Sequence, residues 1–157
     1  MQTYFKLTLV ASVVAASSLS LAQEQVVKIG HVGPISGAKV VVTADGPTLQ
    51  ALDTQLWTFA PLEFVAHCRA DSPVELRQAS PVILANHLND ADALPHHQVL
   101  VNLCHNVTVG FERFERAIEV VSLDDQDRQN ARTRWKHYSD QGYSITRHDL
   151  KLRETYT

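Results

Sequence analysis

The side chains of this 157-residue chain that could do chemistry are its eight histidines and two cysteines. The pair His96 and His97 lies in a polar segment and Cys104 precedes His105, but neither has the ligand spacing of a zinc site. The nucleophile-elbow and phosphate-loop patterns do not occur. Two cysteines are too few for a disulfide scaffold, so free thiols at Cys68 and Cys104 are favoured over a single bridge. Nothing in these residues demands an enzyme or a metal site.

A more informative pattern lies in residues 124–141, which we predict to be a long polar helix. Three cations follow one face of it at four-residue intervals: Arg128, Arg132 and Lys136. Trp135 lies beside this row, and Arg134 adds charge on a neighbouring face. An ordinary solvated helix face is the alternative. The row could instead bind an acidic peptide with an apolar end, because guanidinium groups pair with carboxylates while Trp135 and Val121 receive the apolar side chain.

A second candidate surface is the aromatic segment "LWTFAPLEF" at residues 56–64. Trp57 and two phenylalanines come together there around Pro61. Packing in the core is the alternative for some of them. A cluster this dense can also leave an exposed anchor for a partner protein.

The elements that must position these residues alternate between strands and helices, which predicts a layered α/β domain. A helix that ends at Trp57 is predicted to start with Asp45 or Gly46 as the cap and Pro47 in the first turn, and it carries a row of core leucines, namely Leu49, Leu52 and Leu56. A short helix is expected at residues 110–114 and a polar connection at residues 69–80. Strands are expected at residues 25–32, 39–43, 64–67, 82–85, 99–103, 118–123 and 143–148.

Composition sets limits on the class of protein. Apolar residues make up 45% of the chain and charged residues 20%, as in a single globular domain. A net charge of −3 gives no overall reason to expect direct nucleic-acid binding. In residues 1–22, Lys6 precedes an apolar run and small residues follow, which is typical of a secretory signal; a buried helix is the alternative.

From Lys39 to about His148 the chain resembles the chi subunit family of bacterial DNA polymerase III holoenzyme. The resemblance is carried by "KVVVTADGPTLQALDTQLWTFAPLEFVAH", "PHHQVLVNL", "GFERFERAIEVVS" and "DRQNARTRWKHYSDQGYSITRH". It implies a three-layer α/β fold with a mostly parallel sheet flanked by helices. It also implies a non-catalytic clamp-loader subunit in DNA replication, which pairs with the psi subunit and binds the acidic C-terminal tail of single-stranded-DNA-binding protein. With this reading we expect no catalytic residue, metal, cofactor or small-molecule ligand in the chain. Contact with single-stranded DNA would be indirect, and the location cytoplasmic.

The resemblance also implies two sets of site residues. The acidic tail would bind at Val121, Arg128, Arg132, Trp135, Lys136 and Tyr143. Psi or a helicase-like partner would bind at Trp57, Pro61 and Phe64.

Residues 1–37 resemble something else, the signal peptide and first strand of a periplasmic branched-chain amino-acid-binding protein. The chi-like part would then lack its family's usual first strand and helix. We expect a fusion near Gly37 and Ala38, with a signal-like segment (1–22), a receptor-like strand and seam (23–38), a chi-like domain (39–150) and a tail (151–157). Residues 7–21, if retained, would cover the exposed sheet face. A periplasmic receptor fragment and a non-functional fusion are the alternatives, and an active signal would direct the chain to the periplasm.

Overall fold

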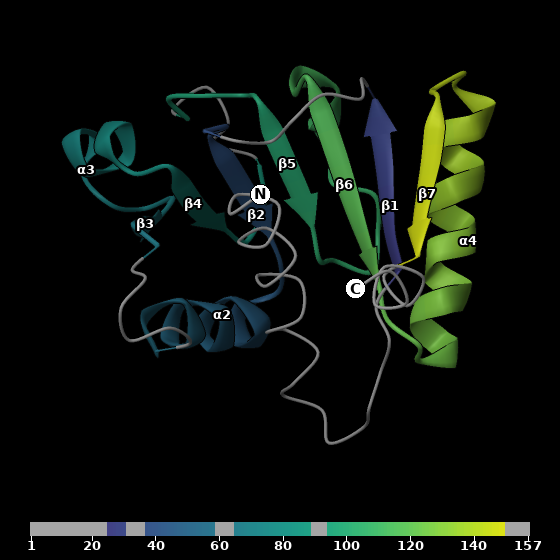
Figure 1. Ribbon diagram of the computed structural model, residues 1–157, viewed down its shortest axis with the longest axis horizontal. Helices are drawn as coiled ribbons and strands as arrows, with labels where there is room; N and C mark the ends of the chain where they lie inside the picture. Colours follow the sequence, from purple (N-terminus) through teal and green to yellow (C-terminus); the bar gives the residue numbers. More distant parts are fainter. Residues whose placement is uncertain (1–24, 31–36, 59–64, 89–93, 150–157) are drawn as a thin grey trace, which may run out of the picture.

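The computed structural model describes residues 25–30, 37–58, 65–88 and 94–149, which form a seven-stranded sheet with helices on both faces (Figure 1). The strands are β1 (Gln25–Gly30), β2 (Val40–Thr43), β3 (His67–Arg69), β4 (Val82–Ala85), β5 (Val99–Asn102), β6 (Arg116–Val121) and β7 (Ile145–Asp149). The helices are α2 (Gly46–Thr58), α3 (Val74–Ala79) and α4 (Asp125–Asp140), with a 3-10 turn η2 (Phe111–Arg113).

The strands lie in the order β3-β4-β2-β5-β6-β1-β7. The five strands from β3 to β6 in this order are parallel, while β1 pairs antiparallel with both β6 and β7. The α/β fold with a mostly parallel sheet is therefore confirmed. β1 lies between β6 and β7, so a segment attributed to a receptor-like head is an internal strand of the sheet.

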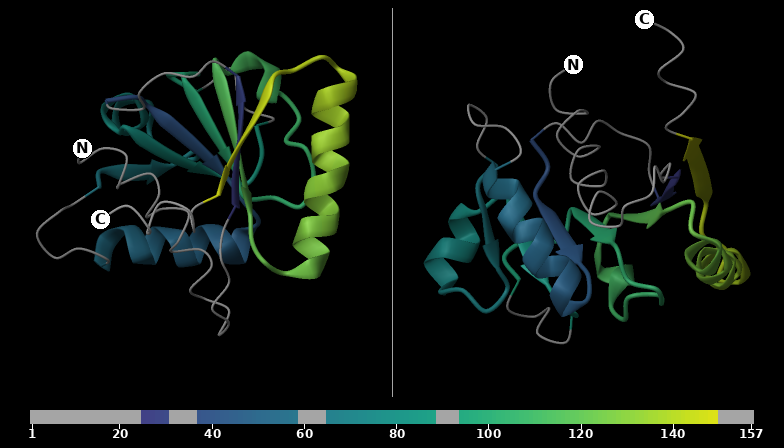
Figure 2. Two further views of the ribbon diagram at one scale, coloured as in Figure 1. Left: turned by 45° about the vertical axis from the view of Figure 1, so that its right-hand side comes forward. Right: turned by 90° about the horizontal axis from the view of Figure 1, so that it is seen from below.

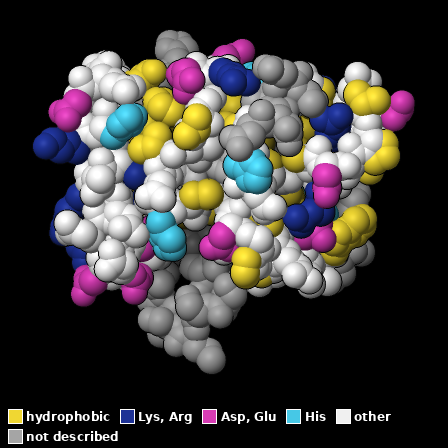
Figure 3. All heavy atoms as spheres, turned by 180° about the vertical axis from the view of Figure 1, so that it is seen from behind, with side chains coloured by type: hydrophobic (Ala, Val, Ile, Leu, Met, Phe, Trp, Pro, Cys, Tyr) yellow, Lys and Arg dark blue, Asp and Glu magenta, His cyan; other side chains and the backbone are white. Residues whose placement is uncertain are grey.

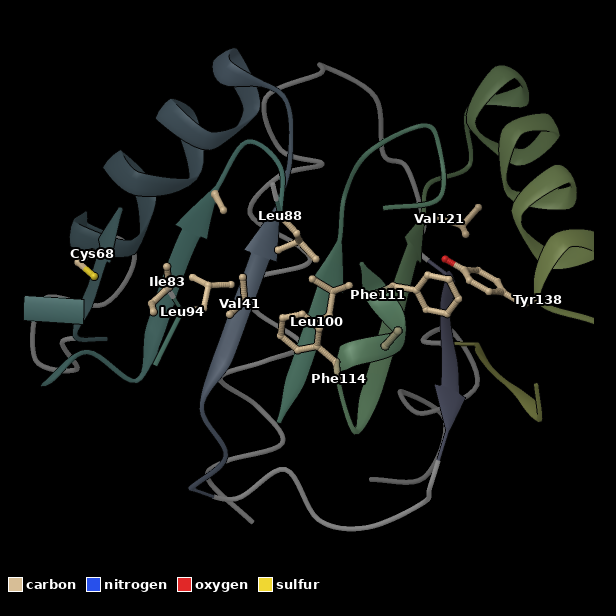
Figure 4. Close-up of a cluster of buried hydrophobic side chains, with 12 residues drawn as sticks. Val41, Cys68, Ile83, Leu88, Leu94, Leu100, Phe111, Phe114, Val121 and Tyr138 are labelled. Atoms are coloured by element: carbon tan, nitrogen blue, oxygen red, sulfur yellow. The ribbon is translucent and has the colours of Figure 1, made fainter. Parts of the chain in front are cut away.

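Alternating side chains of the central strands build one core on each face of the sheet. On one face, Val40 and Val42 pack with the three leucines of α2, as the sequence predicts. On the other face, Val41 belongs to a cluster that extends to Phe111 and to Tyr138 of α4 (Figure 4). The sheet therefore separates α2 from α4, and the two candidate surfaces belong to opposite layers.

Of the two cap candidates at the start of α2, Asp45 and Gly46, the structure selects Asp45. The Asp45 carboxylate accepts a hydrogen bond from the Thr48 backbone N–H at 2.8 Å, and the Asp45 carbonyl accepts one from Leu49 N–H at 2.8 Å. Pro47 follows in the first turn, where its missing N–H costs nothing. The Thr48 hydrogen bonds lower the pKa of Asp45 below its ordinary value.

Replacing Asp45 with alanine is expected to destabilise the protein by about 1 kcal/mol, because a Thr48 N–H loses its acceptor. Asp45→Asn keeps a capping oxygen and should cost little. Since the folded pKa is lowered, the charge contributes stability above the ordinary pKa of aspartate, and this is lost as the pH falls through the lowered pKa. Urea titrations at pH 7 and pH 3 check both points. Equal stability of Asp45→Ala and wild type at pH 7 would contradict the capping role.

Four expectations about local structure need correction or lie outside the described residues. The strand expected at 64–67 is β3 (His67–Arg69), because pairing of His67 with Val82 fixes its register. The polar connection 69–80 contains α3, a six-residue helix without a buried side chain. β6 begins two residues before the strand expected at 118–123, and β7 begins two residues after the start of the strand expected at 143–148. The signal-like segment 1–22, its proposed covering role and the tail 151–157 lie outside the described residues.

The cysteines are free thiols in the structure, as expected. Cys68 is buried on β3 and Cys104 is partly buried after β5. Burial raises the pKa of the Cys104 thiol above its ordinary value, so this side chain is neutral at physiological pH.

Candidate partner-binding site

The site is built on α4, whose start is fixed against the end of β6. The Asp124 carboxylate caps the helix by accepting a hydrogen bond from Asp127 N–H at 3.0 Å. The Asp127 carboxylate in turn accepts from the backbone N–H and the hydroxyl of Ser122, at 2.7 and 2.8 Å. At the other end, Gly142 has a φ of 81°, a left-handed conformation that suits glycine and lets the chain reverse into β7.

Beneath α4 lies a buried network of polar side chains centred on Glu119 of β6. The Arg134 Nε lies 2.8 Å from a Glu119 oxygen, and both side chains are 3% exposed. The Tyr138 hydroxyl donates to Glu119 at 2.5 Å, and the Asn102 amide donates to both carboxylate oxygens at 3.0 and 3.1 Å. Arg134 also donates to the His105 carbonyl at 2.7 Å. These contacts join α4 to β6, β5 and the loop after β5.

The network continues across the sheet through Asn102. Its side-chain oxygen accepts from the hydroxyls of Thr43 and Thr108, at 3.2 and 2.9 Å, and from the Cys104 N–H at 2.9 Å. Burial raises the pKa of Glu119, and the adjacent Arg134 charge opposes that rise. Burial also raises the pKa of Tyr138 far above its ordinary value, so the phenol stays protonated and can donate to Glu119.

A small surface pocket opens above this network, between α4 and the end of β6. Its lining consists of Glu119, Val121, Ala131, Arg134, Trp135 and Tyr138. Val121 is buried, at 4% exposure, whereas 39% of Trp135 is exposed to solvent. Two of the residues expected in the tail site, Val121 and Trp135, therefore meet in one pocket with an apolar wall and an aromatic rim.

The predicted row of cations lies on the solvent side of α4. Arg128, Arg132 and Lys136 are all exposed. The Arg128 guanidinium is 3.6 Å from the exposed carboxylate of Asp125, and Arg132 donates to the Gln129 side chain at 2.9 Å. Such exposed contacts are weak, so both guanidinium groups can turn toward a ligand. In Figure 3, α4 lies at the left edge, where Lys and Arg side chains gather among Asp and Glu.

Arg134 does not add to this surface charge, contrary to the expectation from its sequence position. Its side chain points inward and is almost fully buried, because Glu119 neutralises it within the core. The network was missed in the sequence. The signals that could have indicated it are Glu119 within the apolar run "AIEVV" and the spacing of four residues between Arg134 and Tyr138.

Tyr143, also expected in the tail site, packs at the C-terminal end of α4. Its ring lies edge-on to Phe111, with 5.3 Å between the ring centroids, and 38% of the residue is exposed. The lining of the pocket is supplied by other residues. Tyr143 thus lies just after α4, near the end of the helix that carries Trp135, but it does not line the pocket.

The other expected surface is represented by Trp57, at the end of α2. This residue is 58% exposed, and its ring packs edge-on against His67 at a centroid distance of 5.0 Å. The His67 Nε2 lies 3.2 Å from the Asp53 carboxylate, which holds the histidine in place beneath the indole. Pro61 and Phe64 lie outside the described residues. Trp57 and Trp135 therefore lie on different layers of the domain.

Within the residues that the structure describes, no group of three or more His, Cys, Asp or Glu side chains is placed to hold a metal ion. The helices in that part of the chain are also too short or too polar to cross a bilayer.

Most of the chain is similar to known proteins of one family. The family described as "DNA polymerase III chi subunit, HolC" matches residues 24–146. A Pseudomonas aeruginosa protein named "DNA polymerase III subunit chi" is 31% identical over 107 residues, which cover 68% of this chain and 70% of that protein. The family match spans the pocket and Trp57, and it also crosses the expected seam at Gly37 and Ala38.

Proposed function

Because the chain belongs to the DNA polymerase III chi subunit family, we propose that it is a non-catalytic accessory subunit of the polymerase's clamp loader in DNA replication. In this proposal it connects the clamp loader to single-stranded-DNA-binding protein through the acidic C-terminal tail of that protein. Contact with single-stranded DNA is then indirect, through the protein that coats it. The net charge of −3 agrees with this, since a direct binder of the phosphate backbone needs many cations.

The observation that carries the proposal is the position of Trp135. Its partly exposed ring forms the rim of an apolar-walled pocket, and the cation row of Arg128, Arg132 and Lys136 lies along the same helix. The pocket is small, so it suits one apolar side chain and not a folded domain. A peptide with an apolar end and acidic residues nearby would satisfy both parts, because its ring or aliphatic group would cover Val121 while its carboxylates face the cations.

Replacing Arg132 with alanine is expected to weaken binding of an acidic peptide that ends in phenylalanine by about 1–2 kcal/mol, or roughly five- to thirtyfold. Arg132 is exposed, so the protein itself should keep its stability. Fluorescence titration with a labelled peptide measures the effect. Arg69→Ala, on the opposite edge strand β3, is the matched control and should bind like wild type. Equal affinities of the Arg132 and Arg69 variants would count against the assigned site.

For the second surface we propose the psi subunit as the partner at Trp57, with a helicase-like protein as a competitor for the same place. An exposed tryptophan held by His67 is a common kind of anchor at an interface. Pro61 and Phe64 belong to this proposal through the resemblance of their segment. Separation of the surfaces on two layers would let psi and the acidic tail bind at the same time.

The proposed place of action is the cytoplasm, where replication occurs. The signal-like segment 1–22 and the fusion near Gly37 and Ala38 stay predictions. Cell fractionation followed by N-terminal sequencing tests them together. A cytoplasmic protein that begins at Met1 supports the replication role, whereas a periplasmic protein that begins at Gln23 would exclude it.

A further inference from the structure

Arg147 on β7 is an exposed cation on the sheet face that α4 covers. Its face follows from the register, because Arg147 and Glu119 both pair with Val27 of β1, and opposite residues in antiparallel ladders share a face. Glu119 faces α4, since it bonds to Arg134 and Tyr138. Ile145, two residues before Arg147, agrees with this because it packs against the core cluster on the α4 side.

The same register fixes how far along α4 this residue lies. The row through Glu119, Val27 and Arg147 passes beneath the turn of α4 from Arg134 to Tyr138, which also carries Trp135. Two strand spacings separate Glu119 from Arg147, or about 10 Å between their backbones. α4 packs against β6 and β7, so it spans this distance (Figure 2).

Trp135 lies on the β7 flank of the helix. Arg134 bonds to the His105 carbonyl and the His137 ring packs near Phe111, so both residues mark the flank toward β5 and its loop. Successive residues of a helix are about 100° apart around its axis. Trp135 therefore lies on the opposite flank of α4, across the surface of the helix that faces the sheet. Trp135 is thus on the flank of α4 nearer to the strand that carries Arg147.

We propose that Arg147 is a fourth cation of the tail site and contacts a carboxylate of the bound acidic peptide from the sheet side. The inference rests on the proposed function. A peptide with its apolar end on Val121 and Trp135 would lie between the helix cations on one side and Arg147 on the other. Arg147 lies just beyond the residues matched by the family, so neither the match nor the expected site residues assign it this role.

The test is a double-mutant cycle on the full chain. Arg147→Ser is expected to raise the Kd of an acidic, Phe-ended peptide about three- to fivefold, and Arg147→Glu about tenfold or more, with a reduced dependence on salt. Arg69→Ser and Arg69→Glu on the opposite edge strand should leave the Kd unchanged. A second peptide, with its aspartates replaced by asparagine and its phenylalanine kept, should show no effect of either Arg147 substitution.

The outcomes separate this inference from the proposed function. If wild type binds the acidic peptide and the Arg147 variants bind it as well as wild type does, the role of Arg147 is excluded and the site on α4 stands. If they weaken both peptides equally, Arg147 acts on the pocket and not on a carboxylate, which also overturns the inference. If wild type binds neither peptide, the proposed function fails and this inference fails with it.

Discussion

Replacing Arg134 with methionine is expected to lower the free energy of unfolding by about 3–5 kcal/mol. The guanidinium lies against Glu119 at 2.8 Å, and both side chains are almost fully buried. Removing it leaves a carboxylate without its counter-charge and frees the His105 carbonyl. Methionine replaces the aliphatic stem of Arg134 but not its guanidinium, so the loss combines the unpaired Glu119 charge with the space that the guanidinium leaves. Chemical denaturation monitored by circular dichroism measures it.

Arg132→Met is the matched control, because the same substitution two residues earlier falls on the exposed face of α4. It should change stability by no more than about 0.5 kcal/mol. Adding Glu119→Gln to Arg134→Met should recover part of the loss, since the buried charge is then removed as well. Equal stabilities of the Arg134 and Arg132 variants would show that the ion pair between Arg134 and Glu119 does not hold α4 on the sheet.

Replacing Trp135 with alanine is expected to weaken binding of the acidic, Phe-ended peptide by about 2–3 kcal/mol, or roughly 30- to 160-fold. The indole forms the rim of the pocket and is the group best placed to cover an apolar end. Trp135→Tyr keeps an aromatic rim and should lose much less. Isothermal titration calorimetry gives both affinities and shows whether the variant still binds one peptide per chain.

The same substitution at Trp57 is the control for the Trp135 variant, because the two tryptophans are expected to bind different partners. Trp57→Ala removes the more exposed of the two tryptophans, on the opposite layer of the domain. It should bind the peptide like wild type and should lose psi in a co-purification. Trp135→Ala should keep psi. Loss of both partners in either variant would contradict two independent surfaces.

The parts of the fold that could be predicted from the sequence are those set by local signals. Asp45 and Pro47 mark the start of α2, and its three leucines mark the buried face. The β-branched run at β2 and the acidic cap of α4 are equally local. β3 was misplaced because its three residues are defined by pairing with β4, and α3 was missed because a helix without a buried face has no apolar periodicity.

Only the solvent-exposed residues of the candidate site could be predicted from the sequence. The spacing of the cations and Trp135 placed them on α4 as the structure has them. The buried side could not be predicted from spacing, because Arg134 and Glu119 lie 15 positions apart and meet only when α4 packs on β6. Arg147 depends on strand register in the same way, since its face follows from β1 and not from its neighbours in sequence.

The most direct test of the proposed role uses single-stranded-DNA-binding protein itself. The full chain is passed over immobilised single-stranded DNA that carries either the intact protein or a version without its acidic C-terminal tail. We expect retention on the intact coat and its loss on the tailless coat, on bare DNA and for Trp135→Ala. Equal retention on intact and tailless coats would contradict the account.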